Sequence, residues 1–138
     1  MQELLTPVRQ SYGRCAMNPN FIDYFYEEFL KSHPSIKPMF SNTDFKKQKE
    51  LLRTGIGMLL AHLEGKPAGT MTLDRIAESH NKQHMNINPN LYQFWIDSLI
   101  KSVKQCDQKF SPDLERSWQK VLRAGVDYIT ARYDAPAS

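Results

Sequence analysis

Apolar residues recur along most of the chain at the three- and four-residue intervals that place them on one face of a helix. The clearest run lies mid-sequence, where Phe45, Leu52 and Ile56 share one face with a single polar residue, Gln48. No segment alternates apolar and polar residues for long enough to predict a strand. The pattern predicts an all-α protein, with helices over about 7–17, 19–32, 44–64, 89–105 and 112–133, and a shorter helix that contains Leu73 and His80.

Helix starts are predicted where a proline follows a capping residue. An N–H at the first helical position has no partner within the helix, so proline, which lacks the N–H, fits there. By this rule helices begin at Thr6-Pro7, Asn18-Pro19, Asn88-Pro89 and Ser111-Pro112. Thr43 and Thr72 are the expected caps of the two helices between them. His33-Pro34 ends the second helix, since a residue before proline avoids helical angles, and the glycines and proline of 65–69 predict a loop.

The length of 138 residues fits one domain, and a hydrophobic fraction of 41% with a charged fraction of 24% is typical of globular proteins. We therefore expect a single domain over 1–138, with a flexible tail at 134–138. The net charge of +3 is small, and the densest lysine cluster, at 46–49, is diluted by neighbouring polar and acidic residues. A solvated helix face explains that cluster better than a nucleic-acid surface does.

Two isolated cysteines, Cys15 and Cys106, are too few for a disulfide framework or a cysteine-rich metal site. They favour a reducing compartment. The sequence begins without a charged and apolar leader, and no apolar run approaches the roughly 20 residues of a membrane span. These features predict a cytoplasmic protein with no membrane association.

One histidine stands on an apolar face. Leu73, Ile76 and His80 are spaced i, i+3 and i+7, so they share one side of the short helix. A histidine in such a place is more often a hydrogen-bonded core residue than a ligand, so the spacing alone leaves both roles open. A second histidine, His84, follows four residues later, before a short polar corner at 86–88.

The order of these elements, and two segments within them, resemble single-domain bacterial globins and the globin domains of flavohaemoglobins. FYEEFLKSHPSIKPMF, residues 25–40, resembles their second and third helices, with the same helix-ending His-Pro pair and final phenylalanine. RIAESH, residues 75–80, resembles the segment that ends at their haem-ligating histidine, and Tyr92 and Trp118 match as well. The resemblance covers nearly the whole chain and implies the globin fold with haem b, bound non-covalently because no C-x-x-C-H motif is present.

The resemblance implies a role for several residues. His80 would ligate the iron, with the carbonyl of Ile76 accepting its other ring N–H, and His84 is the alternative ligand. Tyr26, fourteen residues before Phe40, matches the distal tyrosine of the family. Gln48 matches the distal residue of the central helix, unless Lys47 or Lys49 turns inward instead. The apolar residues expected against the haem are Met39, Phe40, Leu52, Ile56, Ile76, Ile87, Leu91 and Trp95.

The chain departs from flavohaemoglobins in two places. From His80, the matching Ile87 and Tyr92 lie two residues further on, which implies a two-residue insertion at the corner. Choosing His84 would instead require a two-residue deletion. The second departure is Tyr133, fifteen residues after Trp118, where flavohaemoglobins have a glutamate that pairs with the tyrosine and the proximal histidine. The resemblance therefore does not extend to a proximal histidine strengthened by glutamate.

Three functions follow from these expectations. The first is a haem protein that binds O2, NO and CO, for oxygen storage or scavenging or for NO detoxification. Dioxygenase activity would need a separate reductase, because no G-x-G-x-x-G fingerprint is present. The second is a gas-sensing globin that acts through a partner, an output domain or an oligomer. The third is a helical binding module without haem, in which Tyr26, Gln48 and His80 only fill the core.

Overall fold

The computed structural model describes residues 1–134, and over these residues it contains helices and no strand, as predicted. Of the expected tail, residues 135–138 lie outside the described residues. None of the described helices is long and apolar enough to cross a bilayer. The elements in order are α1 (Gln2–Ala16), α2 (Phe21–Lys31), the 3-10 helix η1 (Lys37–Phe40), α3 (Phe45–Leu63), α4 (Pro67–His80), the 3-10 helix η2 (Pro89–Leu91), α5 (Tyr92–Cys106) and α6 (Pro112–Thr130).

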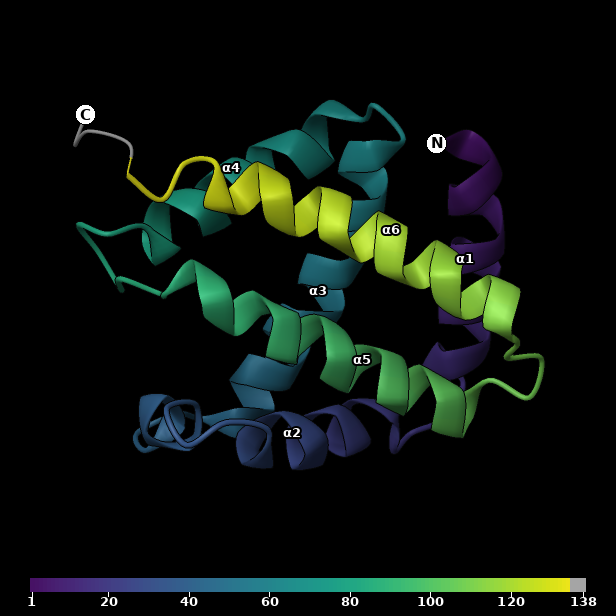
Figure 1. The fold of residues 1–138 in the computed structure, drawn as a ribbon, viewed down its shortest axis with the longest axis horizontal. Coiled ribbons are helices and arrows are strands. Elements are labelled where there is room, and N and C mark those ends of the chain that lie inside the picture. The colour runs from purple at the N-terminus through teal and green to yellow at the C-terminus, as the bar shows by residue number, and fades with distance from the viewer. Residues whose placement is uncertain (135–138) are drawn as a thin grey trace.

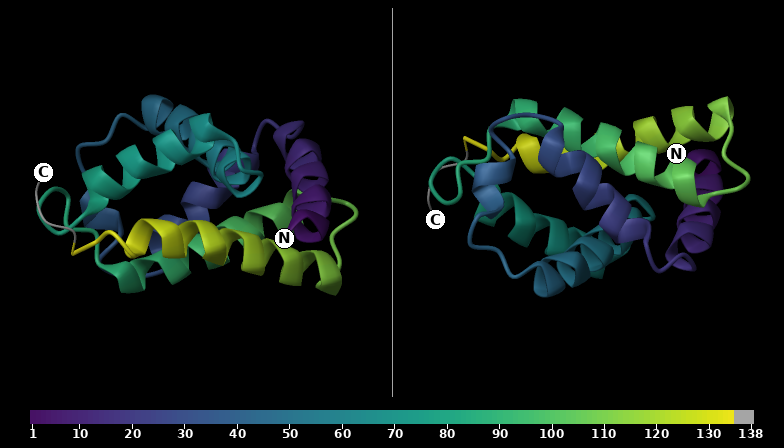
Figure 2. Two further views of the ribbon diagram at one scale, coloured as in Figure 1. Left: turned by 90° about the horizontal axis from the view of Figure 1, so that it is seen from above. Right: turned by 90° about the horizontal axis from the view of Figure 1, so that it is seen from below.

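Helices α5 and α6 run antiparallel and side by side, as the short connection around Phe110 predicts (Figure 1). Helix α2 packs on α5, whereas α3 and α4 pack on each other and on α6. Helix α1 crosses the end of the α5–α6 pair at which the two are connected (Figure 2). The corner between α4 and α5 lies at the opposite end, near the last turn of α6 (Figure 1).

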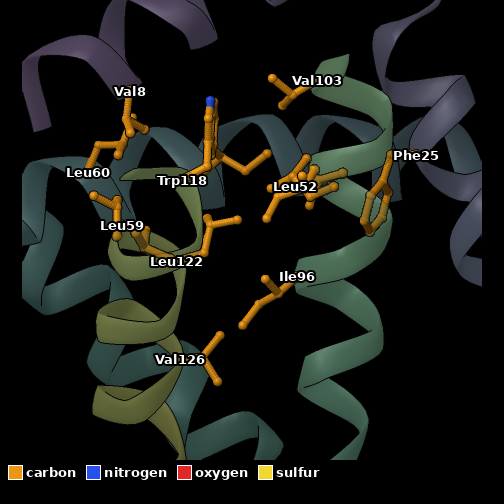
Figure 3. Packing of buried hydrophobic residues seen from close by; sticks show 14 of the residues in the cluster. Val8, Phe25, Leu52, Leu59, Leu60, Ile96, Val103, Trp118, Leu122 and Val126 are labelled. Atoms are coloured by element: carbon orange, nitrogen blue, oxygen red, sulfur yellow. The ribbon is translucent and has the colours of Figure 1, made fainter. Parts of the chain in front are cut away.

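The core forms where α6 faces α3 and α5. Trp118, Leu122 and Val126 of α6 are at most 1% exposed and lie among buried leucines of α3 and Ile96 of α5 (Figure 3). Gly125 allows α3 to approach α6 closely, because a Cβ atom there would lie 2.4 Å from the Leu59 side chain. Apolar burial in this layer holds the helices that carry the candidate site.

A buried polar network closes the α1 end of the bundle. The indole N–H of Trp118 donates to the Ser11 hydroxyl at 2.9 Å, and that hydroxyl donates to Asp107 at 2.6 Å. The Arg14 guanidinium also donates to Asp107. Burial by itself would raise the pKa of Asp107, but the hydrogen bonds from Arg14 and Ser11 outweigh it and lower the pKa to about 2. Asp107 therefore stays ionised and ties α1 to α5 and α6.

Two helix starts differ from the predictions. Helix α1 begins at Gln2 and contains Pro7, which was expected at its start. Helix α4 begins at Pro67 rather than after Thr72, whose hydroxyl instead donates to the carbonyl of Ala68. The predicted loop at 65–69 is therefore short, and Gly69 lies inside α4. Tertiary packing explains that glycine, because a Cβ atom there would lie 2.3 Å from the backbone nitrogen of His62 on α3.

The remaining helix ends are close to the predictions. Ser111 caps α6 as expected, with its hydroxyl accepting the N–H of Leu114. Asp44, rather than Thr43, caps α3 by accepting the N–H groups of Lys46 and Lys47. Asn88 caps η2 instead of α5, and α2 begins at Phe21, two residues after Pro19. Helix α6 ends at Thr130, three residues before its predicted end. These shifts leave the predicted order of helices intact.

Candidate functional site

His80 is the last residue of α4, and its ring reaches across to the first residue of α5. The Nδ1 atom of His80 lies 3.0 Å from the hydroxyl oxygen of Tyr92, and the two ring centroids are 6.3 Å apart. The expected partner was the carbonyl of Ile76, but that carbonyl accepts the hydroxyl of Ser79 at 3.0 Å. The prediction for the partner was therefore wrong, because α5 brings a phenol to the histidine from outside its own helix.

The surroundings keep both partners neutral. Burial lowers the pKa of His80 below its ordinary value of 6.5, so the imidazole is uncharged at neutral pH. Burial also raises the pKa of Tyr92 to about 12, so the phenol keeps its proton. In the tautomer in which Nδ1–H donates to the Tyr92 oxygen, Nε2 keeps its lone pair. Coordination of a metal through Nε2 requires this tautomer.

The alternative ligand, His84, lies in different surroundings. It is exposed in the corner after α4, and its Nδ1 atom lies 2.8 Å from the side-chain oxygen of Asn81. Asn81 is buried and also accepts the backbone N–H groups of Gln83 and His84, so these contacts are local to the corner. Within residues 1–134, His84 thus forms no side-chain hydrogen bond to the helices that carry the other candidate residues.

Tyr26, the residue predicted as the distal tyrosine, lies in an aromatic cluster. Its side chain is 5% exposed, and its ring packs edge-on against Phe40 and Phe45 at centroid distances of 6.2 and 5.5 Å. The hydroxyl donates to the backbone carbonyl of Gln48 at 3.4 Å, which is long for an O–H···O bond. Burial raises the pKa of Tyr26, so the hydroxyl remains a donor. The structure therefore brings Tyr26, Phe40 and the start of α3 together.

The lysines near Gln48 point elsewhere or stay in solvent. Lys49 forms an ion pair with Asp23 of α2 at 2.6 Å, and Lys47 is exposed. Gln48 is half-buried and lies one turn before the buried Leu52. Its backbone carbonyl is the group that meets the Tyr26 hydroxyl, so this turn of α3 is the one that contacts the distal candidate.

Helix α5 connects the surroundings of His80 with those of Tyr26. Tyr92 and Trp95 lie one turn apart on it, and Tyr92 contacts His80. The Trp95 ring packs edge-on against Phe25 at 6.2 Å, and Phe25 packs against Tyr26 at 4.9 Å. One helix face therefore contacts both groups of predicted residues, although they lie more than fifty residues apart in the sequence.

The other apolar residues predicted at this site differ in exposure. Leu52 and Ile56 of α3 are buried, whereas Ile76, Ile87, Leu91 and Trp95 are half-buried and Met39 is 45% exposed. Leu51 was not among the predicted site residues. It is a further candidate, because it is a large apolar residue that is 61% exposed. Leu51 lies three residues after Gln48, so helical spacing from the distal candidate was the signal that could have found it.

The corner between α4 and α5 is held by the last described residues. The hydroxyl of Tyr133 donates to the side-chain oxygen of Asn86, and the backbone carbonyl of Tyr133 accepts the N–H of Lys82 at 2.9 Å. Asn86 has a φ of 53°, which an asparagine tolerates better than most residues. The N–H of Ile87 donates to the carbonyl of His80 at 3.0 Å. Tyr133, at which the chain was expected to depart from flavohaemoglobins, thus anchors this corner.

Comparisons with known proteins agree with this architecture. The model of the globin family matches residues 23–129. The crystal structure of protein PA3967 from Pseudomonas aeruginosa PAO1, described as structurally highly homologous to a human hemoglobin, resembles this chain with a TM-score of 0.90. The two sequences are 35% identical, and the match covers 94% of this chain and 98% of that chain. The chain belongs to the globin family, and its all-α architecture is the globin fold.

Proposed function

We propose that this globin binds haem b non-covalently, with His80 as the iron ligand, and that it reversibly binds O2, NO and CO. The observation that carries the proposal is the pairing of His80 with Tyr92. It supports a neutral imidazole with a fixed ring orientation, and metal-ligating histidines commonly have such a partner on their second nitrogen. The contacts of His84, by comparison, are confined to the corner.

The residues around His80 also fit a large apolar group. Half-buried aromatic and aliphatic side chains from η1, α4, the corner and α5, together with the buried Leu52 and Ile56 of α3, are available to pack against a porphyrin. Exposed Met39 and Leu51 would be covered by such a group, which gives their exposure a reason. The proposed haem contacts are Met39, Phe40, Leu51, Leu52, Ile56, Ile76, Ile87, Leu91 and Trp95.

When bound, haem supplies an iron atom with one open coordination position for a diatomic gas. Tyr26 and Gln48 are the proposed donors to that gas. The long bond from Tyr26 to the Gln48 carbonyl is weak, so the hydroxyl can turn toward a better acceptor at little cost. A buried donor of this kind stabilises a partly charged acceptor by about 1–3 kcal/mol. We expect these donors to stabilise bound O2 more than bound CO, because bound O2 would carry more partial negative charge and accept a stronger hydrogen bond.

The physiological role that we propose is oxygen storage or scavenging, or NO detoxification with a separate reductase. Two free cysteines, Cys15 and Cys106, suit the reducing conditions of a cytoplasmic protein. A gas sensor that acts through a partner is the alternative. Catalytic consumption of NO with an added reductase would favour detoxification, whereas a change of oligomeric state on O2 binding would favour sensing.

The test is the absorption spectrum of the haem-reconstituted protein in ferric, ferrous and CO-bound forms. We expect stoichiometric haem uptake and a histidine-type ferrous–CO spectrum that His80→Ala removes or alters. His84→Ala is the matched control and should leave the spectrum unchanged. The reverse pattern would move the ligand to His84. Failure of the wild-type chain to take up haem would refute the proposal.

A further inference from the structure

A hollow with a volume of about 580 Å³ lies beside Phe40. It is formed where the end of α2, the turn after it and the start of α3 meet, in the blue segment at the lower left of Figure 1. Its walls include Leu30, Pro34, Phe40 and Phe45. None of its walls comes from α4 or α5, which carry His80 and Tyr92, although it shares Phe40 with the proposed haem contacts. Its volume falls within the range of small-molecule pockets, and its walls are mostly apolar.

The charged residues of this hollow are all of one sign. Lys31 and Lys37 line it, and no aspartate or glutamate does within the part of the chain that the structure describes. Over residues 1–134 Lys37 forms no ion pair, and Lys31 pairs with Glu28 at 3.3 Å on the surface, where such a pair is weak. His33 also lines the hollow, with its Nδ1 atom accepting the N–H of Ser35 at 3.0 Å. The two lysines are therefore available to receive an anion.

We propose that this hollow binds an amphipathic carboxylate of the size of a medium-chain fatty acid. The apolar chain would lie on the wall formed by Leu30, Pro34 and the two phenylalanines, where its burial is favourable. The carboxylate would accept charge-assisted hydrogen bonds from Lys37 and Lys31. An apolar wall together with two lysines should favour such a molecule over both uncharged apolar molecules and small inorganic anions.

The same wall connects the hollow to the distal candidate. Phe40 and Phe45 stack on each other at 6.0 Å, and both pack edge-on against Tyr26. A molecule in the hollow that packs on these two rings would therefore act on residues that contact Tyr26. On the basis of the proposed function, occupancy of the hollow changes the rate at which O2 dissociates. This coupling rests on that function, whereas carboxylate binding itself does not.

The binding is tested by isothermal titration of the full chain, as purified, with decanoate. We expect saturable one-to-one binding that Lys37→Glu weakens at least about tenfold, since each 1.4 kcal/mol is a factor of ten in affinity. Lys104→Glu is the matched control, because it reverses an exposed charge on α5, outside the hollow. Decanol, which lacks the charge, should bind more weakly to the wild type than decanoate does.

Two results would overturn the site: no saturable binding of decanoate by the wild type, or equal affinities for the wild type and Lys37→Glu. The thermal midpoint of each variant verifies that the fold is intact. The O2 dissociation rate with and without decanoate is a separate measurement. An unchanged rate at saturation would refute the coupling to Tyr26. A failure to load haem would refute the proposed function, while the titration would still decide whether the hollow binds a carboxylate.

Discussion

The hydroxyl oxygen of Tyr92 lies 3.0 Å from the Nδ1 atom of His80, so the first residue of α5 orients the last residue of α4. The partner of the histidine is a phenol rather than a carboxylate. It is neutral, because burial raises the pKa of Tyr92 to about 12. A neutral acceptor orients the ring without giving it the anionic character that a carboxylate would. This geometry suits the proposed haem ligand, because it orients the His80 ring without adding anionic character to that ring.

Replacing Tyr92 by Phe tests this relationship. The variant keeps the ring packing but removes the hydroxyl that pairs with His80 Nδ1, so we expect haem to dissociate about 10- to 100-fold faster. The measurement is the rate of haem transfer to an excess of a haem-free acceptor globin. Tyr24→Phe on α2 is the control, since it removes a half-exposed phenol on a different helix. Equal rates for Tyr92→Phe and the wild type would contradict an orienting role.

Tyr26→Phe tests the proposed distal donor. Loss of a buried hydroxyl that stabilises the bound gas by about 1–3 kcal/mol should speed O2 dissociation roughly 5- to 150-fold. CO dissociation should change much less, because CO accepts a weaker hydrogen bond. Stopped-flow measurement of both rates provides the comparison. Tyr12→Phe, which removes a phenol bonded to the Arg53 carbonyl, is the control. A parallel rise in both rates would indicate repacking rather than loss of a donor.

The lowered pKa of His80 predicts how the stability of the haem-free protein depends on pH. The folded state holds the ring neutral, whereas the unfolded state protonates it near the ordinary value of 6.5. The free energy of unfolding should therefore fall as pH drops below about 6.5 and level off below the folded-state pKa. Urea unfolding at a series of pH values, for wild type and His80→Gln, measures this contribution. We expect the variant to lose less stability over that interval, and identical pH profiles would show that His80 is not responsible.

The contact between Gly125 and Leu59 predicts a packing effect. A methyl group at Gly125 would lie 2.4 Å from the Leu59 side chain, in a core of fully buried residues, so Gly125→Ala should destabilise the fold by about 1–3 kcal/mol. Gly13→Ala is the control, because nothing lies within 4 Å of its Cβ position. That change should be neutral or stabilising by up to about 1 kcal/mol, since alanine favours a helix more than glycine does. Equal effects in chemical denaturation would refute the close approach of α3 and α6.

The helical class, the order of the helices and several of their ends are predictable from the amino-acid sequence alone. These features depend on periodicity and on capping, which act within a few residues, as at Ser111 and at His33-Pro34. Resemblance to globins also singles out His80 and Tyr26 from their sequence neighbours. The fold brings Tyr26 to the start of α3, while the roles of both residues in binding haem and gas remain predictions.

The groups that meet across helices follow only from how the helices pack. Gly69 was predicted as a loop residue, but it lies within α4. The residue there is a glycine because α3 approaches too closely to leave room for a side chain. The expected partner of His80 was a carbonyl of its own helix, whereas α5 provides Tyr92. Tyr133 likewise reaches Asn86 across 47 positions of the chain. Local patterns do not encode such contacts, because the packing of whole helix faces sets the distances between residues far apart in the sequence.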